Sequence, residues 1–259
     1  MDIVSQMKYL DLLRTSAREA ITNKVSWFYI FVALVGQITA LSSPLTSIIP
    51  SIKLISSEFW FVSVVLSWVF ISALVYSVSQ KELNNHASSV LDSWRKGWSK
   101  IILVGLLNIL FLVALFVLLA LVGVLFRKLI PYGFLGTLIS FIRPILYFGI
   151  CAIIISNGSV VAAIRTSILM FIRNILQTLV ISGILILIQQ ALLDIIVLVF
   201  MSQYDYGILT SPFKTLELPQ VMFWDQVLAL TISPWIVIVF THLYLSFMNT
   251  SASTTLTTS

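Results

Sequence analysis

Charged side chains are scarce in this chain. Asp, Glu, Lys and Arg together make up 10% of its 259 residues, whereas about a quarter of the residues are charged in a typical soluble globular protein. Hydrophobic residues make up 59%. This balance excludes a large soluble domain and indicates a protein of the lipid bilayer, in which one helical crossing takes roughly 20 apolar residues.

Cysteine and histidine are nearly absent as well. Cys151 is the single cysteine and lies in an apolar run, so it forms no intrachain disulfide and no metal-binding cluster, and we expect it to be buried in the core. His86 and His242 are far apart in the sequence. Two isolated imidazoles give little support for a haem or a metal site, so we predict no cofactor.

The usual catalytic patterns are also missing. We find no nucleophile placed with a base and an orienting acid, no phosphate-binding glycine loop, and no carboxylate pair at catalytic spacing. We therefore predict no catalytic residues and a protein that is not an enzyme. An intramembrane enzyme assembled from distant residues stays open as an alternative.

The net charge is +5, and a basic balance is typical of proteins that bind nucleic acid or anionic lipid. The basic residues are spread over short segments beside apolar runs, and no basic face with interleaved aromatic residues is present. We therefore expect anionic headgroups and not nucleic acid as the partner of these charges.

Six apolar runs follow one another along the chain, and each is interpreted as a membrane-spanning helix because β-barrel strands would alternate in polarity. The predicted fold is an all-α polytopic membrane protein, with one domain over residues 1–248 and a disordered tail over 249–259, which is small and polar. The predicted spans are residues 25–43, 59–79, 100–126, 134–156, 174–201 and 223–248.

The distribution of Lys and Arg predicts the orientation. Four basic residues lie in the three connections that would be outside: Lys53, Arg127, Lys128 and Lys214. Ten lie before the first span or in the connections after the second and fourth spans: Lys8, Arg14, Arg18, Lys24, Lys81, Arg95, Lys96, Lys100, Arg165 and Arg173. The positive-inside rule then predicts an inner or plasma membrane protein with both termini in the cytoplasm.

Amphipathic segments precede the outgoing spans. In residues 1–24, apolar residues recur at steps of three and four, and the charged residues occupy the remaining face. Residues 80–99 repeat this pattern, with Trp94 and Trp98 on the apolar stripe. The third such segment follows SNGS at 156–159, an Asn-Gly turn with a Ser N-cap. We predict three helices that lie in the inner membrane interface.

The chain also suggests a three-fold repeat of helix hairpins. Ser16, Ser93 and Ser167 occupy matching points, and seven residues after each of them an apolar span begins, at Asn23, Lys100 and Asn174. Each unit would contain an interfacial helix, a span that leaves the cytoplasmic side and a span that returns to it. The three units would then be parallel repeats related by an axis along the membrane normal. The alternative is that every inner boundary selects a basic amphipathic segment and that the matches arise by chance.

Three stretches carry a resemblance to known proteins: YLDLLRTSAREAITNKVSWFYIFVALV, VLDSWRKGWSKIILVGLLNILF and YFGICAIIISNGSVVAAIRTSILMFIRNILQTL. Together they resemble a broad group of uncharacterised bacterial six-helix membrane proteins, similar to the membrane domain attached to some glycerophosphodiester phosphodiesterases. The resemblance covers most of residues 7–185 and implies a compact helical membrane module, sometimes an accessory to another domain. It implies no phosphodiesterase activity, because nothing in this chain resembles the soluble catalytic domain.

Arg143 lies about ten residues into the fourth predicted span, where an arginine costs roughly 2.5–3.5 kcal/mol on insertion scales. We predict that it pairs with Asp194 in the fifth span, at a depth that differs by only ~3 Å, with Gln189 and Gln190 one turn away. These four residues form either a polar site for a solute or a proton, or a structural ion pair. His242, Asn108 and Gln37 are expected to be interhelical hydrogen-bond partners.

Two functions follow as hypotheses. The first is a scaffold or accessory subunit of a membrane complex that holds a partner protein through its interfacial helices. The second is a small-solute permease whose path passes Arg143, Asp194, Gln189 and Gln190. The residues expected to contact headgroups or a partner at the inner face are Arg14, Arg18, Trp94, Arg95, Lys96, Trp98, Arg165 and Arg173.

Overall fold

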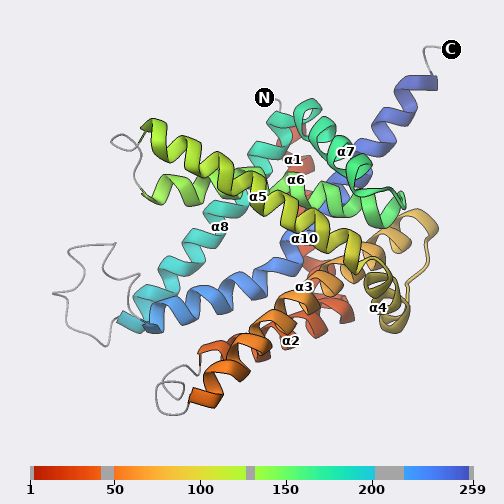
Figure 1. Cartoon of the computed structure of the whole chain (residues 1–259). Helices are drawn as coiled ribbons and strands as arrows, with labels where there is room; N and C mark the ends of the chain where they lie inside the picture. Colours follow the sequence, from red (N-terminus) through yellow and green to blue (C-terminus); the bar gives the residue numbers. More distant parts are fainter. Residues whose placement is uncertain (1–2, 42–49, 127–131, 202–218, 257–259) are drawn as a thin grey trace.

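A computed structural model describes residues 3–41, 50–126, 132–201 and 219–256. These ranges are entirely helical apart from short breaks and contain nine helices and no strand (Figure 1). The helices are α1 (Ile3–Thr22), α2 (Lys24–Leu41), α3 (Pro50–Asn84), α4 (Val90–Ser99), α5 (Ile101–Phe126), α6 (Tyr132–Ile155), α7 (Val160–Arg173), α8 (Ile175–Met201) and α10 (Pro219–Leu256).

Four of these helices, α3, α5, α8 and α10, contain segments long and apolar enough to cross a membrane. Their apolar segments are Val64–Asn84, Ile101–Leu118, Ile175–Leu192 and Thr231–Asn249. A shorter apolar segment, Phe141–Ile155, belongs to α6. The predicted membrane class is therefore supported by the length and composition of the helices.

Short amphipathic helices lead into long apolar ones at single-residue joints. Asn23 separates α1 from α2, Lys100 separates α4 from α5, and Asn174 separates α7 from α8. At each joint the backbone N–H still donates to a carbonyl of the preceding turn, 2.8–3.2 Å away. The three predicted starts of the apolar spans therefore coincide with three breaks between helices. We call α1, α4 and α7 the interfacial helices.

The centre of the bundle consists of α3, α6 and α10, which contact one another. Its core is dense and aromatic: Phe148 of α6 is fully buried, and its ring lies 6.0–6.3 Å from those of Phe240, Tyr244 and Phe247 of α10. Cys151 is buried beside Thr241, with 3.8 Å between Sγ and Oγ1, as expected for a core residue. We call α3, α6 and α10 the central helices.

The other helices surround this centre in a regular pattern. Among the peripheral helices, α2 packs on α3 and α10, α5 on α6 and α3, and α8 on α10 and α6. Among the interfacial helices, α1 packs on α10, α4 on α3, and α7 on α6, and Figure 1 shows α4 folded back beside the end of α3. The same set of helix contacts thus occurs three times around the bundle.

The prediction of one amphipathic helix over residues 80–99 was wrong. Residues up to Asn84 continue α3, and α4 begins only at Val90. Asn85 has a φ of 51°, in the left-handed region that asparagine tolerates, which ends α3. Ser89 caps α4 by accepting a hydrogen bond from the backbone N–H of Asp92.

The turn at SNGS was predicted correctly. Asn157 has a φ of 51°, and the Ser159 side chain caps α7 by accepting a hydrogen bond from the N–H of Ala162. The tail differs from expectation, because α10 continues to Leu256, through most of the segment predicted to be disordered.

Candidate functional site

Three helices meet at a buried carboxylate. The side chain of Glu19 on α1 is only 5% exposed. Its Oε1 accepts a hydrogen bond from Nζ of Lys81 on α3 at 3.0 Å, and its Oε2 lies 2.9 Å from Nε2 of His242 on α10. Glu82 approaches the other side of the imidazole, with its Oε1 3.9 Å from Nδ1. We call these four residues the Glu19 cluster.

The ionisation of Glu19 reflects two opposing effects. Burial raises the pKa of this carboxyl, because it disfavours the charged form, whereas the hydrogen bonds and charges of His242 and Lys81 lower it. The net result is a pKa below the ordinary value of 4.5. Glu19 is therefore a carboxylate at neutral pH, and each of its oxygens has a partner.

Three members of the cluster offer metal-ligand atoms. Glu19, Glu82 and His242 place one such atom each within 4.8 Å of one another, and carboxylate and imidazole groups are common ligands of zinc. The ammonium of Lys81, however, lies 3.0 Å from Glu19 Oε1. A cation would have to displace this charge, so we interpret the cluster as an ion-pair network that fixes α1 to α3 and α10.

A polar cavity of about 470 Å³ lies next to the cluster. It is bounded by the joint between α1 and α2, the C-terminal end of α3, and the turn that leads into α4. Amide and hydroxyl groups make up much of its wall, together with two ammonium groups. The lining residues are Glu19, Thr22, Asn23, Lys24, Val25, Ser77, Lys81, Ala87, Ser88, Ser89 and Val90.

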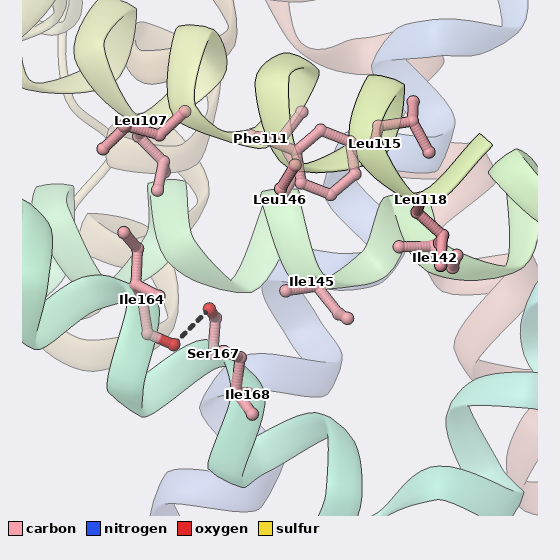
Figure 2. Close-up of a pocket in the computed structure, with 12 residues that line it drawn as sticks. Leu107, Phe111, Leu115, Leu118, Ile142, Ile145, Leu146, Ile164, Ser167 and Ile168 are labelled. Atoms are coloured by element: carbon pink, nitrogen blue, oxygen red, sulfur yellow. Dashed lines mark hydrogen bonds between the residues drawn. The ribbon is translucent and has the colours of Figure 1, made fainter. Parts of the chain in front are cut away.

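A second cavity, of about 240 Å³, lies between α5, α6 and α7 (Figure 2). Its lining consists of apolar side chains apart from Ser167, whose hydroxyl donates to the carbonyl oxygen of Ile164 at 2.9 Å. Figure 2 shows Phe111 of α5 against Leu146 of α6, with Ile168 of α7 on the opposite side. A cavity with this lining suits an acyl chain or an apolar side chain better than a charged solute.

The predicted intramembrane polar site is only partly assembled. Arg143 and Gln189 line one small cavity of about 30 Å³ between α6, α8 and α10. Asp194 accepts a hydrogen bond from Nε2 of Gln190 at 2.9 Å, one turn earlier on α8. Among the described residues, no ion pair joins Arg143 to Asp194. The structure thus brings the four residues together as two pairs and not as one site.

The predicted contacts of the inner face lie on the interfacial helices. Arg14, Arg18, Arg95, Arg165 and Arg173 are all exposed.

The two tryptophans and the lysine of α4 are more constrained. Trp94 lies between Phe70, at 4.8 Å between ring centroids, and Trp98, at 6.1 Å. Lys96 Nζ donates to Oδ1 of Asn157 at 3.3 Å and lies over the ring of Tyr76. Of these three residues, Trp98 is half exposed, whereas the contacts of Trp94 and Lys96 hold α4 in place.

Of the three expected interhelical hydrogen-bond partners, His242 is confirmed by its contact with Glu19. The prediction for Asn108 was wrong, because its amide donates to the carbonyl of Val104 in its own helix. The side chain of Gln37 lies outside the described residues.

The role of Glu19 was missed. Its place on the charged face of the predicted amphipathic helix favours exposure, whereas the structure buries it, so the sequence carried no signal for this role.

Comparison with known proteins identifies no relative: no family model, no curated protein and no solved structure matches the chain. The resemblance to bacterial six-helix membrane proteins therefore stays a prediction.

Proposed function

We propose that the chain crosses the membrane six times as three helix hairpins, with both termini in the cytoplasm. The recurrence of one pattern of helix contacts supports this arrangement, because each hairpin has an interfacial, a peripheral and a central helix. The single-residue joints at Asn23, Lys100 and Asn174 support it as well. In this proposal the three hairpins are parallel repeats about the membrane normal.

We propose that the protein is a scaffold or accessory subunit of a complex in the inner or plasma membrane. The observation that carries this proposal is the filled centre of the bundle, where aromatic rings of α6 and α10 pack against one another. Polar and basic groups gather instead at the interfacial helices. A partner with an acidic surface would find there a set of exposed arginines that have no carboxylate partner among the described residues: Arg95, Arg165 and Arg173.

The experiment is affinity purification from membranes in a mild detergent, followed by identification of the proteins that remain bound. Changing Arg95, Arg165 and Arg173 together to Gln should release the partner while the amount of protein in the membrane stays the same. Lys214→Gln, on the face predicted to be outside, is the matched control. A partner that binds the triple variant and the wild type equally would refute this docking surface.

A permease is the second candidate, favoured by the placement of Arg143 and Gln189 on one cavity between α6, α8 and α10. A volume of about 30 Å³ admits a water molecule and little more, so transport would need the bundle to open. The test is flux in proteoliposomes with Arg143→Gln, which should abolish uptake if the residue lines the path. Unchanged flux would exclude this site from transport.

A further inference from the structure

The polar cavity beside the Glu19 cluster has the features of an anion site. Its volume, about 470 Å³, lies in the range of roughly 300–1,000 Å³ that small-molecule sites occupy. Four helices contribute to its wall, so its shape is determined by the packing of α1, α2, α3 and α4 and not by one loop.

The charge of the wall is positive. Lys24 and Lys81 face the cavity together with a single carboxylate, Glu19, which leaves one net positive charge. Both oxygens of Glu19 are already engaged, by Lys81 and by His242, so this carboxylate is not free to bind a cation. Lys24 is exposed and has no carboxylate partner among the described residues. Its ammonium is available to an anion.

Two helices begin at this cavity. Lys24 and Val25 open α2, and Ser89 and Val90 are the cap and first residue of α4; all four line the wall. A helix N-terminus carries a partial positive charge and directs backbone N–H groups outward, which favours oxyanions. Part of this potential is already used, because the N–H of Val25 donates to Oδ1 of Asn23 at 2.9 Å and the N–H of Asp92 donates to Oγ of Ser89 at 3.0 Å. The two ammonium groups are therefore the main source of positive potential in the cavity.

Uncharged hydrogen-bonding groups complete the wall. Ser77 and Ser88 supply hydroxyls, and the amide of Asn23 donates to Oγ of Ser77 at 3.3 Å, which orders this side of the cavity. Hydroxyls donate readily to phosphate oxygens and also accept from the hydroxyls of a polyol. A phosphate that carries a small polar group would therefore find partners on both sides.

We propose that this cavity binds a phosphate-bearing anion, with Lys24 and Lys81 as the groups that hold the phosphate and the hydroxyls of Ser77 and Ser88 as hydrogen-bonding groups beside it. The source is either the headgroup of an anionic phospholipid or a water-soluble phosphate, because both present the same oxyanion. The proposal is independent of the scaffold function. It assigns to the inner face a defined ligand site, beyond the general attraction of basic residues to headgroups.

The test is binding to the purified full chain after removal of bound lipid. Native mass spectrometry would count bound molecules of phosphatidylglycerol, with phosphatidylcholine as the zwitterionic comparison. Thermal unfolding with inorganic phosphate and with glycerol phosphate would test the soluble ligands. We expect one tightly bound phosphate-bearing ligand and a melting temperature that rises with its concentration.

Variants then locate the site. Lys24→Gln should weaken binding about tenfold, because a charge-assisted hydrogen bond is lost, and Lys24→Arg should keep most of it. Ala87→Phe, which fills the cavity without changing charge, should weaken binding as well. Arg18→Gln is the control, since it removes an exposed charge from the same interface but lies outside the cavity.

The outcomes separate the two sources. Binding of phosphatidylglycerol alone, lost in Lys24→Gln and Ala87→Phe, identifies a lipid headgroup site. Binding of glycerol phosphate or inorganic phosphate, lost in the same variants, identifies a site for a soluble phosphate. Equal binding by wild type, Lys24→Gln and Ala87→Phe would overturn the proposal, as would the absence of a bound phosphate of either source.

Discussion

Oε2 of Glu19 lies 2.9 Å from Nε2 of His242, which joins two residues 223 positions apart in the sequence. The contact connects α1, which begins the described chain, to α10, which ends it. Trp235 reinforces the same connection, because its indole N–H donates to the carbonyl oxygen of Leu13 at 3.2 Å. The first and last helices therefore close the ring of contacts around the bundle.

Replacing His242 by alanine should loosen α1. Oε2 of the buried Glu19 would lose its partner, at a cost of about 1–3 kcal/mol for an unsatisfied buried acceptor. Hydrogen exchange measured by mass spectrometry should accelerate at least about fivefold in α1 and change little in α5. His86→Ala is the matched control, because this exposed histidine lies in the turn after α3. Equal exchange in α1 for wild type and His242→Ala would show that the contact does not hold the helix.

The Glu19 cluster also predicts a dependence on pH. The folded-state pKa of Glu19 is lower than its ordinary value of 4.5, so its ionisation stabilises the docked helix above that pH. This stabilisation is lost as the pH falls below about 4.5 through the folded pKa. Relative to the intrinsic exchange rate at each pH, the protection of α1 should therefore fall between pH 5 and pH 3, roughly the range of acid loss for a depressed carboxyl. In Glu19→Gln this step should be absent, and its persistence there would assign it to another group.

The starts of three apolar helices could be predicted from the sequence because their signal is local. Where an apolar run begins directly after a polar residue, as at Asn23, Lys100 and Asn174, the structure has a helix break. Turn chemistry was equally informative at Asn157 and Ser159. These features depend on a few neighbouring residues, so no knowledge of the packing was needed.

Which face of an interfacial helix contacts the protein could not be predicted in the same way. The apolar stripe predicted for residues 1–24 consists of Ile3, Met7, Leu10, Leu13, Ala17 and Ile21. Of these, Leu10 and Ile21 are 65% and 66% exposed and Leu13 is buried, whereas Ser16 and Glu19 on the other face are buried as well. In α4 and α7 the small residues Gly97 and Ala163 are likewise buried. Close packing of helices in a membrane favours small residues, and large apolar residues then face lipid. The apolar stripe of α1 therefore contains both exposed and buried residues and does not by itself identify the face that packs on the protein.

Gly97→Ala should destabilise the docking of α4. A Cβ at this position would collide with the carbonyl oxygen of Val69 and lie 3.1 Å from the backbone nitrogen of Ala73 on α3, and backbone atoms cannot move aside easily. Overpacking of this kind costs typically about 1–3 kcal/mol. Thermal unfolding in detergent should show a lower midpoint for this variant.

Gly183→Ala provides the comparison for Gly97→Ala. The nearest atom to a Cβ at Gly183 would be Cε1 of Phe141, at an ordinary contact distance of 3.9 Å. Alanine is favoured over glycine in a helix by up to about 1 kcal/mol, so this variant should unfold at the same temperature or higher. If the two variants unfolded at the same temperature, the close contact between α4 and α3 would be ruled out.

The six-span proposal predicts that two inner turns lie on the same side of the membrane. Ser89 and Ser159 are exposed and cap α4 and α7, and α5 and α6 lie between them in the chain. If both α5 and α6 cross the bilayer, cysteines at these two positions should react with a membrane-impermeant maleimide from one side only. The measurement uses Ser89→Cys and Ser159→Cys, each in a Cys151→Ala background, in sealed vesicles of both orientations. Labelling of the two positions from opposite sides would mean that only one of α5 and α6 crosses, and the parallel three-fold arrangement would then fail.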